Sequence, residues 1–141
     1  MDDDPDIFDV AIKILDAFIK EYTTEEHFRE LEGDLITQEE TEDFFNDYIR
    51  ELNLQEFLTL KFTPHAIAQT AINHCSGKRS KIIIQQPVDY TESRIWGVMH
   101  HEIGTHYLRR LNERKQPWFK QRQQFEMLNF LETEEGLACI N

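Results

Sequence analysis

Two histidines, His101 and His106, stand five residues apart, and this spacing restricts what the surrounding segment can fold into. On a regular α-helix each residue advances by about 100°, so the two imidazoles would point roughly 140° apart. A π-bulge, whose i→i+5 turn brings such positions into register, removes this divergence and tends to occur at functional sites. Gly104 lies between the histidines, where a residue without a Cβ atom tolerates backbone strain best. The sequence therefore predicts a π-bulge; without one, Glu102 and His106 are the pair that shares a helix face.

The residue types in this segment suit a catalytic zinc ion. Histidines bind the ion, and a glutamate beside one of them, here Glu102, takes a proton from the attacking water. A catalytic zinc site needs a third protein ligand and an open position for water. The acidic run at residues 132–138, ETEEGLA, is a plausible source of that ligand on a second helix.

The other reading of a histidine on an apolar helix is simple packing. We give that interpretation to His27, His65 and His74. His100 directly precedes the motif, and it is either a residue that supports a ligand or an ordinary core or helix-surface histidine. The enzyme hypothesis therefore competes with a plain helical domain whose histidines are incidental, and bound metal in a folded sample would separate the two.

Two motifs in a fixed order carry a resemblance to a known family. The sequence HEIGTH at residues 101–106, then Gln116-Pro117, then EEGLA at residues 134–138 resembles the microtubule-associated tyrosine carboxypeptidase family and its bacterial relatives with a QEGLA motif. The resemblance extends from about Leu52 to the C-terminus and is weak in the acidic N-terminal third. It implies a zincin-like metallopeptidase that removes the C-terminal tyrosine of α-tubulin, and so a partner in the α-tubulin tail or microtubules.

The resemblance also implies roles for single residues. His101 and His106 would bind one Zn²⁺ ion, and Glu102 would be the general base. The third ligand would be Glu135, because it directly precedes the glycine of the EGLA element. Glu134 stands where the bacterial relatives have glutamine, so we expect it to be replaceable, and Glu132 is the remaining candidate ligand.

Members of the family continue well beyond the EGLA element, whereas this chain ends at Asn141. We therefore expect either a fragment of a catalytic domain or a shortened family member. The alternative to an active peptidase is a catalytically silent module that binds an acidic partner or microtubules. Its binding surface would be the basic cluster that follows the zinc motif, formed by Arg109, Arg110, Arg114, Lys115, Lys120 and Arg122.

Length and charge set the remaining expectations. The 141 residues suit a single domain with a modest core, with an acidic helical portion (1–52) and a portion that carries the motifs (53–141). The resemblance makes it a partial catalytic domain (1–141). Residues 1–60 carry nineteen acidic and four basic side chains, whereas residues 61–141 carry eight and eleven. The net charge of −12 disfavours nucleic-acid binding. We expect neither a secretory signal nor a membrane span, and the two cysteines favour a reduced, cytoplasmic protein, with a cytoskeletal association implied by the resemblance.

Hydrophobic periodicity predicts an α+β fold that is mainly helical with a small β-sheet, which the resemblance makes a zincin-like core. Strands are expected at 57–62 and 81–86. The second of these is either the edge strand on which a zincin-like fold, as the resemblance implies, would dock a substrate peptide, or simply a buried strand of the sheet. Thr91 is expected to cap a long helix that contains the zinc motif. The expected helices cover residues 7–22, 38–52, 66–74, 92–113 and 125–140.

Overall fold

A computed structural model describes residues 6–75, 79–127 and 130–141 and divides the chain into two compact units, Met1–Asp34 and Leu35–Asn141. The first unit contains helices α1 (Ile7–Tyr22) and α2 (Glu25–Glu32). Asp6 and Thr24 cap them by accepting hydrogen bonds from backbone N–H groups of their first turns. Phe18, Tyr22 and Phe28 join the two helices through ring contacts of 4.6–5.3 Å between centroids.

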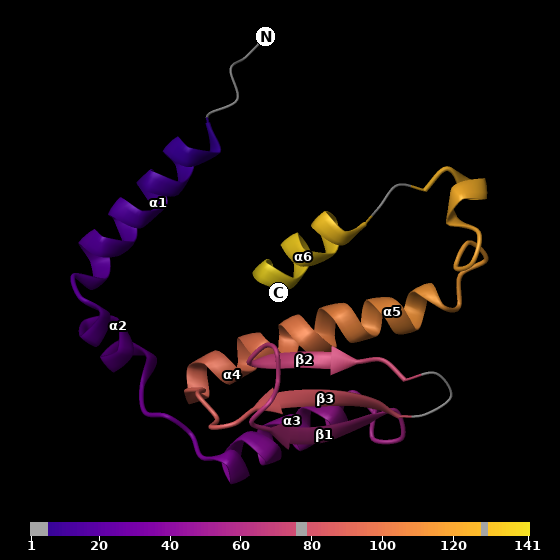
Figure 1. Cartoon of the computed structure of the whole chain (residues 1–141), viewed down its shortest axis with the longest axis horizontal. Coiled ribbons are helices and arrows are strands. Elements are labelled where there is room, and N and C mark those ends of the chain that lie inside the picture. The colour runs from indigo at the N-terminus through magenta and orange to yellow at the C-terminus, as the bar shows by residue number, and fades with distance from the viewer. Residues whose placement is uncertain (1–5, 76–78, 128–129) are drawn as a thin grey trace. The chain divides into compact units, whose positions relative to one another are not determined.

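The second unit, shown in Figure 1, packs helices against one face of a three-stranded sheet. Its elements are α3 (Gln38–Glu51), β1 (Leu58–Thr63), β2 (Thr70–Asn73), β3 (Ser80–Gln85), α4 (Glu92–Met99), the π-helix η1 (His100–Tyr107), α5 (Leu108–Glu113), the 3₁₀ helix η2 (Arg122–Phe125) and α6 (Leu131–Ile140). On β3, Ile82 and Ile84 are fully buried, whereas Lys81 before them is exposed and Ile83 between them is half-buried. This alternation places one face of the sheet in the hydrophobic core.

The strand order is β1-β3-β2, with β1 parallel and β2 antiparallel to β3. β3 is therefore the central strand, and β2 lies at an edge of the sheet. This edge is the one nearest the candidate site, because β2 contacts η1. The docking-edge role considered for residues 81–86 is thus wrong, because both edges of β3 are already paired, and the alternative of a buried sheet strand is confirmed.

Helices α4, η1 and α5 follow one another without a break and form the long helix of this unit (Figure 1). Thr91 caps it as expected, by accepting a hydrogen bond from the backbone N–H of Arg94 at 3.3 Å. Ile95, Met99 and Ile103 are completely buried along its core face. η1 also contacts α6, so the C-terminal helix is held against the middle of the long helix.

The α+β class and the helices expected at 7–22, 38–52 and 92–113 are confirmed, as are strands at 57–62 and 81–86 within one residue. Two expected elements differ. Residues 66–74 contain strand β2 rather than a helix, since Thr70 and Ile72 are β-branched and pair with β3. The helix expected at 125–140 covers only Leu131–Ile140, because Glu126 adopts a left-handed conformation (φ 52°) that ends η2; residues 128–129 lie outside the described part.

Within the described part of the chain, none of the helices is both long and apolar enough to cross a lipid bilayer.

Candidate metal centre

The π-helix η1 brings the imidazoles of His101 and His106 together. Their Nε2 atoms lie 3.2 Å apart, and their ring centroids are 4.9 Å apart with the planes nearly perpendicular. A regular helix would separate these side chains by roughly 140°. The π-bulge predicted from the five-residue spacing is therefore confirmed.

Both imidazoles are oriented by hydrogen bonds at their other nitrogen. Nδ1 of His101 donates to the carbonyl of Ala138 at 3.2 Å, and Nδ1 of His106 donates to the carboxylate of Glu134 at 2.7 Å. Each acceptor has only lone pairs to offer, so in each neutral ring the proton is on Nδ1 and the lone pair is on Nε2. Two lone pairs that face each other at 3.2 Å repel, unless a cation or proton lies between them.

Glu135 completes a set of three donors. Its Oε2 atom lies 3.5 Å from Nε2 of His106, and one donor atom each from His101, His106 and Glu135 all lie within 4.8 Å of one another. Around a tetrahedral zinc ion with bonds of about 2.0–2.1 Å, two donors stand about 3.3 Å apart. The distances at His106 fit this geometry. Glu135 is half exposed, so a rotation of its side chain can close the remaining gap.

Glu134 faces the opposite side of the His106 ring from Glu135. Its side chain is only 8% exposed and also forms an ion pair with Nε of Arg109. Burial alone would raise the pKa of the Glu134 carboxyl, but the hydrogen bonds from His106 and Arg109 lower it overall. Glu134 is therefore the carboxylate that orients the His106 ring, whereas Glu132 is exposed and outside the three-donor set. The expectation that Glu134 is replaceable stays a prediction.

Glu102 lies beside the three donors on the same π-helix and lines the cavities on both sides of them. Burial raises the pKa of its carboxyl, and the nearby His101 and His106 counteract part of this effect. The Glu102 carboxylate is not one of the three converging donor groups, which belong to His101, His106 and Glu135. The arrangement provides a carboxylate that is free to exchange a proton beside a possible metal ion.

His100 points toward helix α3 rather than toward the three donors. Its Nδ1 atom is hydrogen-bonded to the hydroxyl of Tyr48 at 3.1 Å, and the two rings make an edge contact. A Cβ atom at Gly104 would lie only 3.0 Å from the same Tyr48 hydroxyl. The glycine therefore provides space for Tyr48 rather than a strained backbone conformation.

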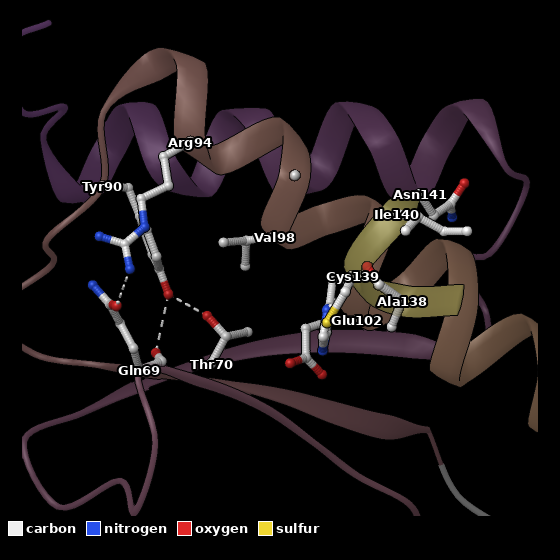
Figure 2. Close-up of a pocket in the computed structure, with 12 residues that line it drawn as sticks. Gln69, Thr70, Tyr90, Arg94, Val98, Glu102, Ala138, Cys139, Ile140 and Asn141 are labelled. Atoms are coloured by element: carbon white, nitrogen blue, oxygen red, sulfur yellow. Dashed lines mark hydrogen bonds between the residues drawn. The ribbon is translucent and has the colours of Figure 1, made fainter. Parts of the chain in front are cut away.

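Two cavities meet at the candidate metal centre, since His101 and Glu102 line both of them. The first, which we name the Arg94 cavity, has a volume of about 530 Å³ and lies between α4 and the C-terminal residues (Figure 2). Figure 2 shows Arg94 beside Gln69 at one end and Glu102 toward the other. The second, the central cavity, has about 370 Å³ and is lined by β2, η1 and α6. Both volumes lie within the range typical of ligand sites.

The basic cluster expected to attract acidic substrates is divided by the structure. Arg109 and Arg122 form ion pairs with Glu113 at 2.9 and 2.7 Å, and both stack on the ring of Phe130. Arg110 and Arg114 form no ion pair with any described residue. Arg94 was missed by the sequence analysis, although its place seven residues before His101, on the same helix face, is a signal that could have found it.

Comparisons with known proteins agree with these observations. The family model described as Microtubule-associated tyrosine carboxypeptidase matches residues 1–141. Microtubule-associated tyrosine carboxypeptidase 1 of Homo sapiens is 28% identical over 137 residues, which cover 93% of this chain and 28% of that protein. The protein of the same name in Rattus norvegicus is 29% identical over the same shares. Putative tyrosine carboxypeptidase MATCAP2 of Mus musculus is 26% identical over 93% of this chain and 25% of its own length. The chain thus spans about a quarter of the length of these relatives.

Proposed function

Because this chain belongs to the microtubule-associated tyrosine carboxypeptidase family, we propose that it acts as a zinc-dependent carboxypeptidase that releases a C-terminal tyrosine from an acidic protein tail, that of α-tubulin. The names of its relatives support the reaction, and their microtubule association supports the partner and a cytoskeletal location. The single observation that carries the proposal is the pair of Nε2 atoms 3.2 Å apart, each with its Nδ1 committed as a donor.

We assign His101, His106 and Glu135 as the residues that would hold the ion. Neutral imidazole nitrogens and one carboxylate are a ligand set that zinc peptidases use, with an open position left for water. Zinc, when bound, supplies Lewis-acid chemistry and a water of lowered pKa. Glu134 and the Ala138 carbonyl keep the two imidazoles in the tautomer that binds metal.

Glu102 acts as the general base. It accepts a proton from the attacking water while the water oxygen forms a bond to the scissile carbonyl carbon. It then donates that proton to the nitrogen of the departing tyrosine, as the bond between carbonyl carbon and nitrogen breaks. Partial burial supports this role, because it raises the pKa of the Glu102 carboxyl and so makes the carboxylate a stronger base.

The edge strand β2 supports a zincin-like arrangement of the substrate. An extended peptide can add to an exposed sheet edge through main-chain hydrogen bonds. Thr70, Ala71 and Ile72 of β2 line the central cavity beside His101 and His106. A peptide paired with β2 would therefore pass directly over the candidate metal centre.

The test combines metal content with tyrosine release. The purified chain should bind one zinc ion and release free tyrosine from a synthetic tubulin-tail peptide, detected by mass spectrometry. Glu102→Gln should keep the zinc and lose the release, whereas His101→Ala should lose both. Glu132→Gln, an exposed change in the same acidic run, is the matched control and should alter neither.

Two results would count against the proposal. Unchanged tyrosine release by Glu102→Gln would remove the assigned general base. Peptide binding without release by the zinc-loaded chain would favour the alternative, a catalytically silent module that binds an acidic partner.

A further inference from the structure

Three separate cavities share lining residues beside β2, and we call the three together the track. The Arg94 cavity and the central cavity share Thr70, His101 and Glu102. The central cavity shares His74 and Arg110 with a third cavity of about 510 Å³, which we name the Arg110–Arg114 cavity. Thr70 at the start of β2 lines the first cavity, and His74, just beyond its end, lines the third. The candidate metal centre lies in the central cavity between these two ends.

At the α4 end, the track offers a single cation. Arg94 is exposed, and its guanidinium donates to the neutral side-chain oxygen of Gln69 at 3.3 Å. It forms no ion pair with any residue in the described part of the chain. Its charge is therefore available for one carboxylate of a ligand.

Arg94 lies at a distance from His101 that one substrate residue and the arginine side chain together can span. Seven positions along a helix separate Arg94 from His101, which is about 10 Å along the axis. One extended residue beyond the scissile carbonyl spans about 3.5 Å. The remaining distance is within the reach of an extended arginine side chain, so Arg94 can contact the carboxylate of the single residue that a carboxypeptidase removes.

At the other end, the track offers a pair of cations. Arg110 and Arg114 are one helical turn apart, which places their Cβ atoms about 5–6 Å from each other. Side chains on one face of an extended peptide repeat at about 6.7 Å. Nε of Arg110 is buried without a hydrogen-bond partner among the described residues. The third basic residue of this cavity, Arg79, is already paired with Glu56 at 3.1 Å.

From the distribution of these charges we infer the direction in which the substrate lies. This inference rests on the proposed carboxypeptidase function. The peptide runs antiparallel to β2, with its terminal residue in the Arg94 cavity and its α-carboxylate bound by Arg94. Upstream acidic side chains bind Arg110 and Arg114. The direction follows because β2 starts at Thr70, which lines the Arg94 cavity, and His74, just beyond its end, lines the Arg110–Arg114 cavity.

The experiment measures binding of three fluorescent peptides by anisotropy. The parent peptide is rich in glutamate and ends in tyrosine with a free carboxylate. The second is its C-terminal amide, and in the third the upstream glutamates are replaced by glutamine. Each is titrated with zinc-loaded Glu102→Gln protein, which does not consume it, and with the same protein carrying Arg94→Gln or Arg110→Gln/Arg114→Gln. The double change Lys115→Gln/Lys120→Gln removes two nearby positive charges that line none of the three cavities and is the matched control.

The two ends of the track should respond to different peptides. The unsubstituted site should prefer the free acid to the amide by about tenfold or more, because a charged hydrogen bond is lost with the amide. Arg94→Gln should abolish that preference and leave the response to upstream glutamine unchanged. Arg110→Gln/Arg114→Gln should abolish the response to upstream glutamine and leave the preference for the free acid unchanged. It should also weaken the salt dependence of binding. Arg94→Lys, which keeps the charge but not the two-pronged contact, should be intermediate.

The inverse pattern, in which Arg110→Gln/Arg114→Gln abolishes the preference for the free acid, would overturn the inferred direction. The inferred direction would also be overturned if Arg94→Gln, Arg110→Gln/Arg114→Gln and the Lys115→Gln/Lys120→Gln control all changed peptide binding equally. Tyrosine release by the chain with native Glu102 separates this inference from the proposed function. Release that does not depend on Arg94 contradicts the direction alone, whereas the expected binding pattern without any release contradicts the reaction and supports the direction.

Discussion

The carboxylate of Glu134 accepts a hydrogen bond from Nδ1 of His106 at 2.7 Å, on the side of the ring opposite the candidate metal position. Groups in this position fix the tautomer of a ligating histidine, and their loss typically lowers metal affinity by about 10–100-fold. Glu134→Gln should therefore weaken zinc binding by that factor, measured by competition with a chromophoric chelator. Glu132→Gln should keep the native affinity; an equal loss in both variants would show a general charge effect instead.

Zinc should stabilise the folded chain, because the ligands we propose for it are brought together only by folding. At a free zinc concentration one hundred times Kd, the expected gain in the free energy of unfolding is about 2.7 kcal/mol. Denaturant titrations with zinc and with a chelator would measure it. His101→Ala should abolish the gain, whereas His65→Ala, an exposed change away from the centre, should retain it.

Gly104→Ala should destabilise the fold by about 1–3 kcal/mol, because the added methyl group would lie 3.0 Å from the Tyr48 hydroxyl. The matched background is Tyr48→Phe, which removes that oxygen. In this background the alanine should be neutral or stabilising by up to about 1 kcal/mol, as expected for glycine replaced in a helix. A double-mutant cycle in urea would measure the coupling, and additive effects would argue against the contact.

His74 should make stability depend on pH. Burial, together with the nearby Arg110 and Arg114, lowers its pKa from 6.5 to about 4, with Glu134 opposing the shift. The unfolded chain therefore binds a proton that the folded chain does not, so stability is complete above about 6.5 and falls as pH decreases toward 4. The ring also stacks on Tyr107 at 6.0 Å.

A comparison of urea midpoints between pH 7.5 and 4 tests the role of His74. His74→Gln should show a shallower decline than the native chain over this window, and His65→Gln is the matched control. Parallel curves for all three proteins would assign the pH dependence to other groups.

Local sequence patterns were sufficient for the long helix and its irregular centre. The spacing of His101 and His106 fixed the need for a π-turn, and Thr91 marked the start of the helix. Strand β2 was not predictable in the same way. Residues 66–74 are rich in alanine and isoleucine and fit a helical pattern, and only pairing with the distant β3 makes them a strand.

The roles of the two neighbouring glutamates also depend on tertiary structure. Glu134 and Glu135 are adjacent on α6, so their side chains leave the helix about 100° apart. The packing of α6 on η1 decides that Glu134 reaches Nδ1 of His106 and that Glu135 approaches Nε2. The motif alone therefore indicated a glutamate in this run without indicating that both would contact the same imidazole.

The extra residue in the turn of η1 sets both the spacing of the two histidines and the direction in which all later side chains of the long helix point. Removing one residue between His101 and His106 would give the four-residue spacing of the usual zinc-peptidase motif, but it would rotate the downstream half of the helix by about 100°. Tyr107 would leave the core and Arg109 would swing away from Glu134. A protein built on this helix can therefore exchange one spacing for the other only by rebuilding its interior at the same time.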